Sequence, residues 1–148
     1  MVATMLTEPV MRHLPPAWHG DYTVPRAREW IKERDNEGTT LLVIEKSTME
    51  PVGLVILIEM DSENAIESIE VRIGYMLSEP AWGRGLASEL VKGFIAWCRT
   101  QAPISTLAGG VDADHPASMR VLEKSGFSLV DGESGDTPNH REYRLRLR

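Results

Sequence analysis

The sequence predicts an α/β fold built on a mixed β-sheet. Three observations support this prediction: closely spaced strand patterns early in the chain, an amphipathic helix directly after the clearest strand, and an alternation of strands and helices beyond it. Closely spaced strands favour hairpins, whereas strands separated by helices favour parallel crossover connections.

The chain opens with a stretch over residues 1–24 that prolines and a glycine punctuate, so we expect it to be irregular. A helix is predicted from Pro25 to about Glu37, because proline suits the first turn of a helix and Gly38 suits its end. The next expected elements are strands at 40–45 and 52–58 and a turn at 60–64. The second strand is apolar throughout, which predicts burial on both faces.

Residues 69–77 form the clearest strand pattern. The residues of one set are Ile69, Val71, Ile73, Tyr75 and Leu77. They alternate with Glu70, Arg72, Gly74 and Met76. A period of two residues predicts one face packed on a core and one face free to border a cleft.

The second half of the chain predicts two helices and three strands. One helix runs from about Gly85 to Arg99, with an apolar stripe at three- and four-residue steps. The other covers 116–124, with Val121 and Leu122 facing inward and Gly126 as its stop. The expected strands are 106–111, 127–130 and 141–147, with a polar loop at 131–139.

Length and composition indicate a single domain over residues 1–148, with 42% apolar and 26% charged residues. The single cysteine, Cys98, excludes an internal disulfide framework and favours a reducing compartment. The net charge of −6 argues against a nucleic-acid partner. We find neither a run of roughly 18 apolar residues nor a signal-peptide pattern, so we expect a cytoplasmic protein with no membrane partner.

A glycine-rich turn joins the clearest strand to the following helix. Its sequence is Trp82-Gly83-Arg84-Gly85-Leu86-Ala87. Gly83 and Gly85 allow the backbone to approach a ligand closely and to adopt dihedral angles that other residues avoid. The amides at a helix N-terminus are unpaired and carry a partial positive charge, which suits a pyrophosphate. Arg84 either adds a cation beside the phosphate or points to solvent, and a plain tight connection is the other interpretation of the turn.

Other phosphate-binding motifs fit less well. A dinucleotide-binding turn needs a third glycine near position 88, where this chain has Ser88, and an acidic ribose partner about 20 residues further on. The Gly-Lys-Ser/Thr of a Walker motif does not occur.

At this turn the chain resembles the GNAT superfamily, whose motif reads Gln/Arg-x-x-Gly-x-Gly/Ala. Trp82 replaces the first residue of that motif. The Trp-Gly-x-Gly version resembles the branch that acetylates the N-termini of ribosomal proteins. The second signature of that branch, Asn-x-x-Ser-x-x-Val-Leu-Glu-Lys-x-Gly-Phe, matches residues 115–127, with His115 in place of the asparagine.

The resemblance covers roughly Pro25 to Arg148 and implies a GNAT-like fold. That fold has a mixed, mostly antiparallel sheet, splayed between strands 4 and 5, with helices on both faces. Since this chain starts inside the segment that resembles the family's first helix, we expect the first strand to be missing. The activity implied is transfer of an acetyl group from acetyl-CoA to an amine.

The resemblance also implies which residues contact acetyl-CoA. The backbone of Met76 and Leu77 is expected to pair with the pantetheine arm, like an added strand, and to donate to the oxyanion. The residues expected around the pyrophosphate are Trp82, Gly83, Arg84, Gly85, Leu86, Ala87 and Ser88. His115 either contacts the cofactor arm, as the asparagine does in the family, or caps its helix or faces solvent.

Two residues are candidates for proton transfer. Ser118 matches the serine near the cofactor sulfur in the resembling branch, and the alternative is a hydrogen bond near the helix start. Glu70 is the candidate general base because it shares a strand face with Met76, and the alternative is an ion pair with Arg72. Glu59 and Glu67 are rival bases.

The remaining aromatic, cysteine and histidine residues have mainly structural interpretations. Cys98 lies on the apolar helix stripe and is expected to be a buried, inert thiol rather than a covalent nucleophile. Tyr143 either packs in the core or reaches the thiol end of coenzyme A. Trp18 and Trp82 are expected beside the cleft, and Trp30 and Trp97 packed in helices. The histidines show no metal-ligand spacing, so we expect no metal.

Two functional interpretations follow. The first is an N-acetyltransferase that acts on a small-molecule or peptide amine, and the alternative is a non-catalytic acyl-CoA sensor. A homodimer through an exposed last strand is a further expectation.

Overall fold

The computed structural model describes residues 5–12, 14, 18–61, 68–112, 115–130 and 140–147. Backbone contacts divide the chain into two compact units. Unit 1 comprises Met1–Ile58 and Gly74–Arg84, and unit 2 comprises Glu59–Ile73 and Gly85–Arg148. The expectation of one domain over 1–148 stays a prediction.

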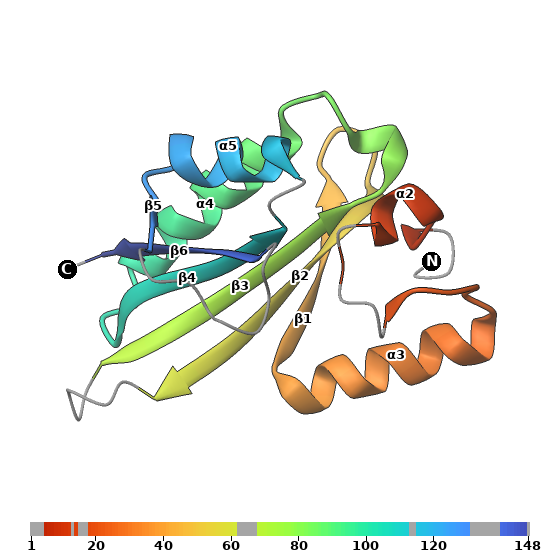
Figure 1. Cartoon of the computed structure of the whole chain (residues 1–148), viewed down its shortest axis with the longest axis horizontal. Helices are drawn as coiled ribbons and strands as arrows, with labels where there is room; N and C mark the ends of the chain where they lie inside the picture. The colour runs from red at the N-terminus through yellow and green to blue at the C-terminus, as the bar shows by residue number, and fades with distance from the viewer. Residues whose placement is uncertain are drawn as a thin grey trace. The chain divides into compact units, whose positions relative to one another are not determined.

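The strands form a six-stranded sheet in the order β1-β2-β3-β4-β6-β5 (Figure 1). Its strands are β1 Thr39–Glu45, β2 Glu50–Asp61, β3 Ile69–Leu77, β4 Ile104–Asp112, β5 Ser128–Leu129 and β6 His140–Arg146. β3 pairs with β4 in parallel, whereas β1 with β2, β4 with β6, and β5 with β6 are antiparallel. The predicted mixed and mostly antiparallel sheet is therefore confirmed.

Three details of the sheet bear on the expectations from the sequence. In the described stretches before α3, namely 5–12, 14 and 18–23, no strand occurs. The last strand, β6, lies between β4 and β5, so it is not the exposed edge through which we expected a homodimer. The parallel pairing of β3 with β4 covers Ile69–Arg72 and Ile104–Ala108, and the splay between these strands stays a prediction.

Unit 1 is built on α3, Val24–Glu37, which packs beside β1 (Figure 1). The predicted helix is confirmed, with Pro25 in its first turn and with Thr23 accepting a hydrogen bond from the Arg26 amide at 3.3 Å. Trp30 is buried in a cluster with Leu54 and other apolar side chains, as expected. That cluster comprises Met5, Leu6, Val10, Met11, Ala27, Trp30, Leu54, Ile56 and Met76.

Gly38 ends α3 for a reason other than a left-handed turn. Its φ is −178°, which any residue adopts, and its amide donates to the Arg34 carbonyl at 3.1 Å. A β-carbon at this position would overlap the Leu57 carbonyl oxygen. The glycine is therefore needed because the chain passes close to β2.

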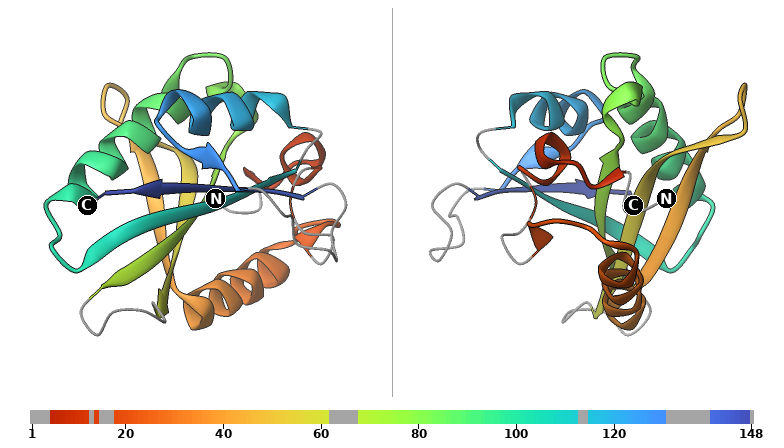
Figure 2. Two further views of the ribbon diagram at one scale, coloured as in Figure 1. Left: turned by 60° about the vertical axis from the view of Figure 1, so that its left-hand side comes forward. Right: turned by 90° about the vertical axis from the view of Figure 1, so that its right-hand side faces the viewer.

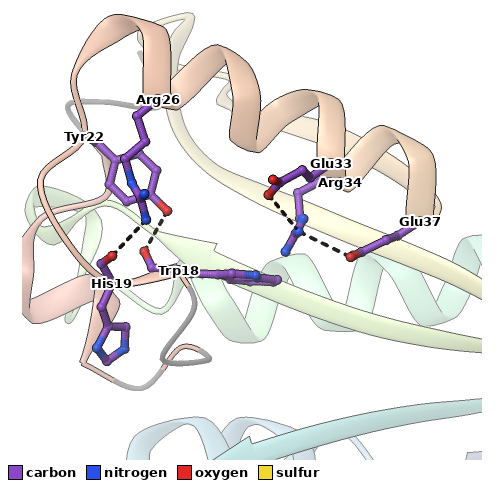
Figure 3. A network of polar contacts seen from close by, with 7 residues as sticks. All are labelled: Trp18, His19, Tyr22, Arg26, Glu33, Arg34 and Glu37. Carbon is purple, nitrogen blue, oxygen red and sulfur yellow. Dashed lines mark hydrogen bonds and ion pairs between the residues drawn. The ribbon is translucent and has the colours of Figure 1, made fainter.

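Two arginines of α3 hold the preceding segment in place (Figure 3). The Arg34 guanidinium lies 4.3 Å from the Trp18 ring centre and pairs with Glu33 and Glu37 at 3.5 and 3.3 Å. Arg26 donates to the His19 carbonyl at 2.9 Å. Trp18 also meets Trp30 edge to face, with ring centres 5.5 Å apart. Part of the region expected to be irregular is thus ordered, and the short helix α2, Glu8–Met11, lies within it.

β2 is longer than predicted. Residues 52–56 are buried, which confirms the expected strand buried on both faces. The strand continues through Met60 and Asp61, so the turn predicted from residue 60 is wrong at its start, and residues 62–64 lie outside the described part. Backbone pairing needs no apolar side chains, so a polar extension of an apolar run can remain a strand.

In unit 2, α4 (Leu86–Arg99) and α5 (Pro116–Lys124) contact each other and lie on the same side of β4 and β6 (Figures 1 and 2). Their apolar faces supply Val91, Cys98 and Leu122, which are buried. The Phe127 amide donates to the Leu122 carbonyl at 3.0 Å, and Gly126 has a φ of +102°, a glycine cap that confirms the predicted stop. Leu122 faces inward as expected, whereas Val121 is only half-buried.

Trp97 packs within its helix, as expected, but on the surface of the protein. It is 52% exposed and stacks on Phe94, with ring centres 6.0 Å apart. Within the described part of the chain, no helix combines the length and apolar character needed to cross a membrane.

Candidate active site

The predicted phosphate turn leads into the N-terminus of α4. Gly83 and Gly85 have φ values of +72° and +74°, in the left-handed region that favours glycine. Gly85 is the N-cap residue, and α4 then runs for 14 residues from Leu86. A β-carbon on either glycine would meet no other atom within 4 Å, so the backbone there is open. The conformation requires glycine because of the backbone angles rather than crowding.

The amides at the start of α4 have no acceptor within the described residues. The first hydrogen bond of the helix runs from the Glu89 amide to the Gly85 carbonyl at 3.2 Å. No described backbone or side-chain group accepts from the preceding amides, those of Gly85, Leu86, Ala87 and Ser88, nor from those of Gly83 and Arg84. Free amides at the positive end of a helix dipole fit a phosphate group.

Trp82 has a local structural role that explains its place in the turn. Its indole N–H donates to the Leu77 carbonyl at 2.8 Å, and its amide donates to the Glu79 carbonyl at 3.0 Å. These bonds close the loop around the short 3-10 helix η2, Glu79–Ala81. The ring remains 47% exposed.

Arg84 has an ion-pair partner within the protein, and its contact to a phosphate stays a prediction. Its guanidinium pairs with the carboxylate of Glu45, at the end of β1. Glu45 is largely buried, whereas Arg84 is about half exposed. The ion pair therefore anchors the glycine turn to β1 within unit 1.

Met76 and Leu77 are buried at the end of β3. Gly53 of β2 lies directly beside them, because a β-carbon on this glycine would overlap the Met76 carbonyl oxygen. The Ser78 amide donates to the Val52 carbonyl at 2.8 Å. This role of Gly53 was not predicted, although a glycine inside an apolar strand is a general sign of close backbone approach.

His115 and Ser118 lie together at the start of α5. His115 is the N-cap residue, but its side chain makes no capping hydrogen bond. Ser118 is half-buried in the first turn of the helix. Leu122, one turn further on, is buried beside Gly109.

Glu70 does not form the ion pair with Arg72 that we considered as its structural role. Arg72 instead forks onto Glu142 of β6, with its Nη2 2.9 Å from Oε2 and its Nη1 bonded to Oε1. These bonds raise the pKa of the Arg72 guanidinium. Glu70 Oε1 lies 3.4 Å from Arg144 Nε in an ion pair and has no hydrogen-bond partner among the described residues.

The rival bases differ in what the structure describes. Glu59 is exposed near the end of β2, and Glu67 lies outside the described residues. Glu142 and Arg144 were not among the residues predicted from the sequence. The signal was present in the alternation of residues 140–146, where two charges of opposite sign share a face and complement those of Glu70 and Arg72.

Tyr143 and Cys98 are core residues, as expected for packing roles. Tyr143 is buried, and its hydroxyl donates to Glu123 Oε1 at 2.9 Å. Burial raises the pKa of Tyr143, and this hydrogen bond raises it further. Burial also raises the pKa of the Cys98 thiol to about 11, which favours the unreactive protonated form.

Comparison with known proteins settles the family. The sequence model described as the acetyltransferase (GNAT) domain matches residues 2–128, which is most of the chain. The chain belongs to the GNAT family.

Two curated Bacillus proteins resemble this GNAT domain. It is 30% identical over 107 residues to the uncharacterized protein YkkB of Bacillus subtilis, a match that covers 69% of this chain and 60% of YkkB. It is 27% identical over 109 residues to the uncharacterized N-acetyltransferase p20 of Bacillus licheniformis, with 70% and 59% of the two chains covered. The matches thus span about 60% of the length of these relatives.

Solved structures of GNAT proteins share the fold. A GNAT-family acetyltransferase from Bacillus anthracis aligns with a TM-score of 0.78 at 16% identity, covering 99% of this chain and 87% of that one. Spermidine N-acetyltransferase from Vibrio cholerae, in complex with CoA and spermine, gives 0.69 at 16% identity, covering 94% and 83%. Ribosomal-protein-S5-alanine acetyltransferase from Vibrio fischeri gives 0.67 at 15% identity, covering 99% and 87%.

Proposed function

We propose that this GNAT domain is an N-acetyltransferase that moves an acetyl group from acetyl-CoA to a primary amine. The observation that carries the proposal is the start of α4, where amides with no acceptor among the described residues follow two left-handed glycines in a member of this family. The CoA in the Vibrio cholerae structure and the alanine acceptor named for the Vibrio fischeri enzyme are consistent with this activity.

The turn and the helix start supply the groups for the diphosphate of CoA. The free amides of Gly83 to Ser88 are the donors, with the left-handed glycines fixing their direction. Trp82 shapes the loop through its bond to Leu77, and Arg84 anchors it through Glu45. His115, at the start of α5, is the proposed contact to the cofactor arm.

Acetyl-CoA supplies an activated thioester. The protein must accept a proton from the amine, donate a proton to the departing thiolate, and stabilise the negative charge that develops on the carbonyl oxygen. An α-amine has a pKa near 8 and a lysine-like amine one near 10.4, so much of the acceptor is protonated at neutral pH. Glu70, which has a carboxylate oxygen without a hydrogen-bond partner in the described part of the chain, is the proposed base, acting directly or through water. Ser118 is the proposed donor to the departing thiolate, and a backbone amide of Met76 or Leu77 the proposed oxyanion donor.

The acceptor class remains a small-molecule or peptide amine, in a cytoplasmic setting. The net charge of −6 attracts such a cation weakly. Spermine and a peptide with an N-terminal alanine represent the two kinds of acceptor named for the solved relatives.

Thiol release from acetyl-CoA tests the function directly. The panel contains spermine, an alanine-starting peptide and simple amino acids, and we expect release with at least one of them. Glu70→Gln should lower kcat by about 10²- to 10⁴-fold while leaving CoA affinity within about twofold, because the amide keeps the shape but cannot take the proton. Glu59→Gln is the matched control and should keep its activity.

The outcomes separate the two interpretations. Tight CoA binding without turnover on any amine would identify a sensor module. Failure to bind CoA at millimolar concentration would exclude both interpretations.

A further inference from the structure

Two charged contacts cross β4 on one face of unit 2. Arg72 of β3 reaches Glu142 of β6, and Arg144 of β6 reaches Glu70 of β3. Tyr143 points to the other face, because its hydroxyl bonds Glu123 of α5. Since neighbouring residues of a strand point to opposite faces, these contacts lie on the face away from α5.

The register of the strands explains how the charges meet. Arg72 is aligned with Ala108 on β4, and Ala108 is aligned with Arg144 on β6. The next position on this face of β4 is Gly110, which is aligned with Glu142. Because β4 has only small side chains at these positions, the long side chains of β3 and β6 can meet above it.

The two carboxylates of this network are bonded very differently. Both oxygens of Glu142 accept from the Arg72 fork. Glu70 has a single ion pair, at 3.4 Å, to an arginine whose side chain is 57% exposed. That separation exceeds an ordinary charge-assisted hydrogen bond, and Glu70 Oε1 is buried without a hydrogen-bond partner among the described residues.

We infer that Glu142 is a positioning residue that holds Arg72 away from Glu70 and so leaves the Glu70 carboxylate able to accept a proton. This inference rests on the proposed role of Glu70 as the base. Arg72 and Glu70 are two residues apart on one strand face, about 7 Å at the backbone. The fork to Glu142 holds the Arg72 guanidinium across β4 on a partner other than Glu70.

The other charged groups to consider around Glu70 are those of the described residues on β6, β4 and β2. On β6 they are Arg144 and Arg146, the latter aligned with Thr106, which is itself aligned with Glu70. From Thr106 to Gly110, β4 contributes no ionisable side chain. On β2, Glu59 is exposed, and of Asp61 only the backbone is described. Arg72, which is half-buried and shares a strand face with Glu70, is therefore placed to change the proton affinity of Glu70.

The direction of the effect follows from electrostatics. With Glu142 changed to glutamine, Arg72 loses its anionic partner, and Glu70 becomes the nearest carboxylate on its own strand. An arginine beside a carboxylate stabilises the ionised form and lowers the pKa of that carboxylate. The Glu142→Gln protein should thus hold a weaker base at position 70.

Carbon-13 NMR of the glutamate side-chain carboxyls measures this without requiring turnover. In Glu142→Gln, we expect the Glu70 titration midpoint to fall by about one pH unit or more relative to wild type. In the double variant R72Q/E142Q, we expect it to return close to its value in R72Q. Glu123→Gln removes the same charge from the opposite face, keeps an acceptor for Tyr143, and should leave the midpoint unchanged.

Glu142→Asp provides the test if Glu142→Gln fails to fold. It keeps the charge but shortens the side chain, which weakens the fork, so the midpoint should fall in the same direction by a smaller amount. An unchanged Glu70 midpoint in these variants would overturn the inference. The inference would also be overturned if the Glu70 titration midpoint fell as far in R72Q/E142Q as in Glu142→Gln, because the effect would then not depend on Arg72.

The pH profile of kcat/KM links the network to the reaction. The acid limb should move to lower pH in Glu142→Gln by the same amount as the Glu70 midpoint. The Glu70 titration midpoint could shift in Glu142→Gln although the wild-type protein releases no thiol with any amine. That outcome would contradict the proposed function but support the control of Glu70 by Glu142. Turnover with an unmoved acid limb would contradict the positioning role alone.

Discussion

At the scale of single residues, Cys98 makes the fold sensitive to alkaline pH. Its thiol is buried on the apolar face of α4, and burial raises its pKa from 9.0 to about 11. The folded state therefore favours the protonated thiol more than the unfolded state does. This stabilisation of the folded state is fully present below pH 9 and decreases as the pH rises toward 11. At pH 11 the loss of stability amounts to about 2 kcal/mol. Urea unfolding at pH 8 and pH 11 should reveal the loss.

Cys98→Ala is the control for this prediction. The variant is expected to lose about 1–2 kcal/mol at pH 8, because it leaves a small cavity, but to lose less on going to pH 11 than wild type. Tyr143, whose pKa is also raised by burial, titrates in both proteins and so cancels in the comparison. Equal alkaline losses in the two proteins would show that the thiol is not the group responsible.

The structural role of single residues could be predicted from the sequence better than their interaction partners. The buried Cys98 follows from its place on an apolar stripe, and the glycines of the turn follow from their spacing. The partners of Arg72 and Arg84 do not, because each pairs with a carboxylate on a distant part of the chain. Long charged side chains reach several neighbours, and only the register of the strands selects among them.

At the scale of elements, the N-terminus of α4 predicts a separation between ligand binding and helix stability. Gly85→Ala places a β-carbon at a φ of +74°, which costs about 1–2 kcal/mol, although no atom crowds the position. If the turn relaxes to relieve this strain, its amides lose their common direction. We expect CoA affinity to fall about tenfold or more, measured by calorimetric titration, while the protein stays folded.

Gly93→Ala is the matched substitution within the same helix. Gly93 is an exposed residue inside α4, and a β-carbon there would meet nothing within 4 Å. Alanine is favoured over glycine in a helix interior by about 0.5–1 kcal/mol, so this variant should unfold at a higher temperature. Its CoA affinity should equal that of wild type. A loss of affinity in both variants would indicate a general effect of disturbing α4 rather than a role for the turn.

The elements themselves were predictable where periodicity was strong. The strand at 69–77 and the helix at 116–124 agree with the structure at both ends, since alternation and capping signals mark each boundary. The structure differs from the prediction where the prediction relied on the types of residue present rather than on their periodicity. β2 runs past its apolar segment into Glu59 to Asp61. This outcome does not depend on local sequence, because pairing is set by neighbouring elements.

At the scale of the whole molecule, two strands belong to both units. β3 contributes Ile69–Ile73 to unit 2 and its remaining residues to unit 1, and β2 passes from unit 1 to unit 2 after Ile58. Neither unit can lose its strands without interrupting a strand of the other. We therefore predict a single cooperative unfolding transition for the domain, with the calorimetric enthalpy equal to the van't Hoff enthalpy.

A pair of core substitutions makes this prediction specific. Leu54→Ala removes buried volume from the cluster of unit 1, and Leu107→Ala does so in β4 of unit 2. Each change costs about 2–5 kcal/mol, so each should lower the midpoint of the same transition by roughly 10 °C. If the units unfolded independently, each substitution would move only one of two transitions and leave the other at its wild-type temperature. Shared strands predict instead that a cavity in either unit destabilises both.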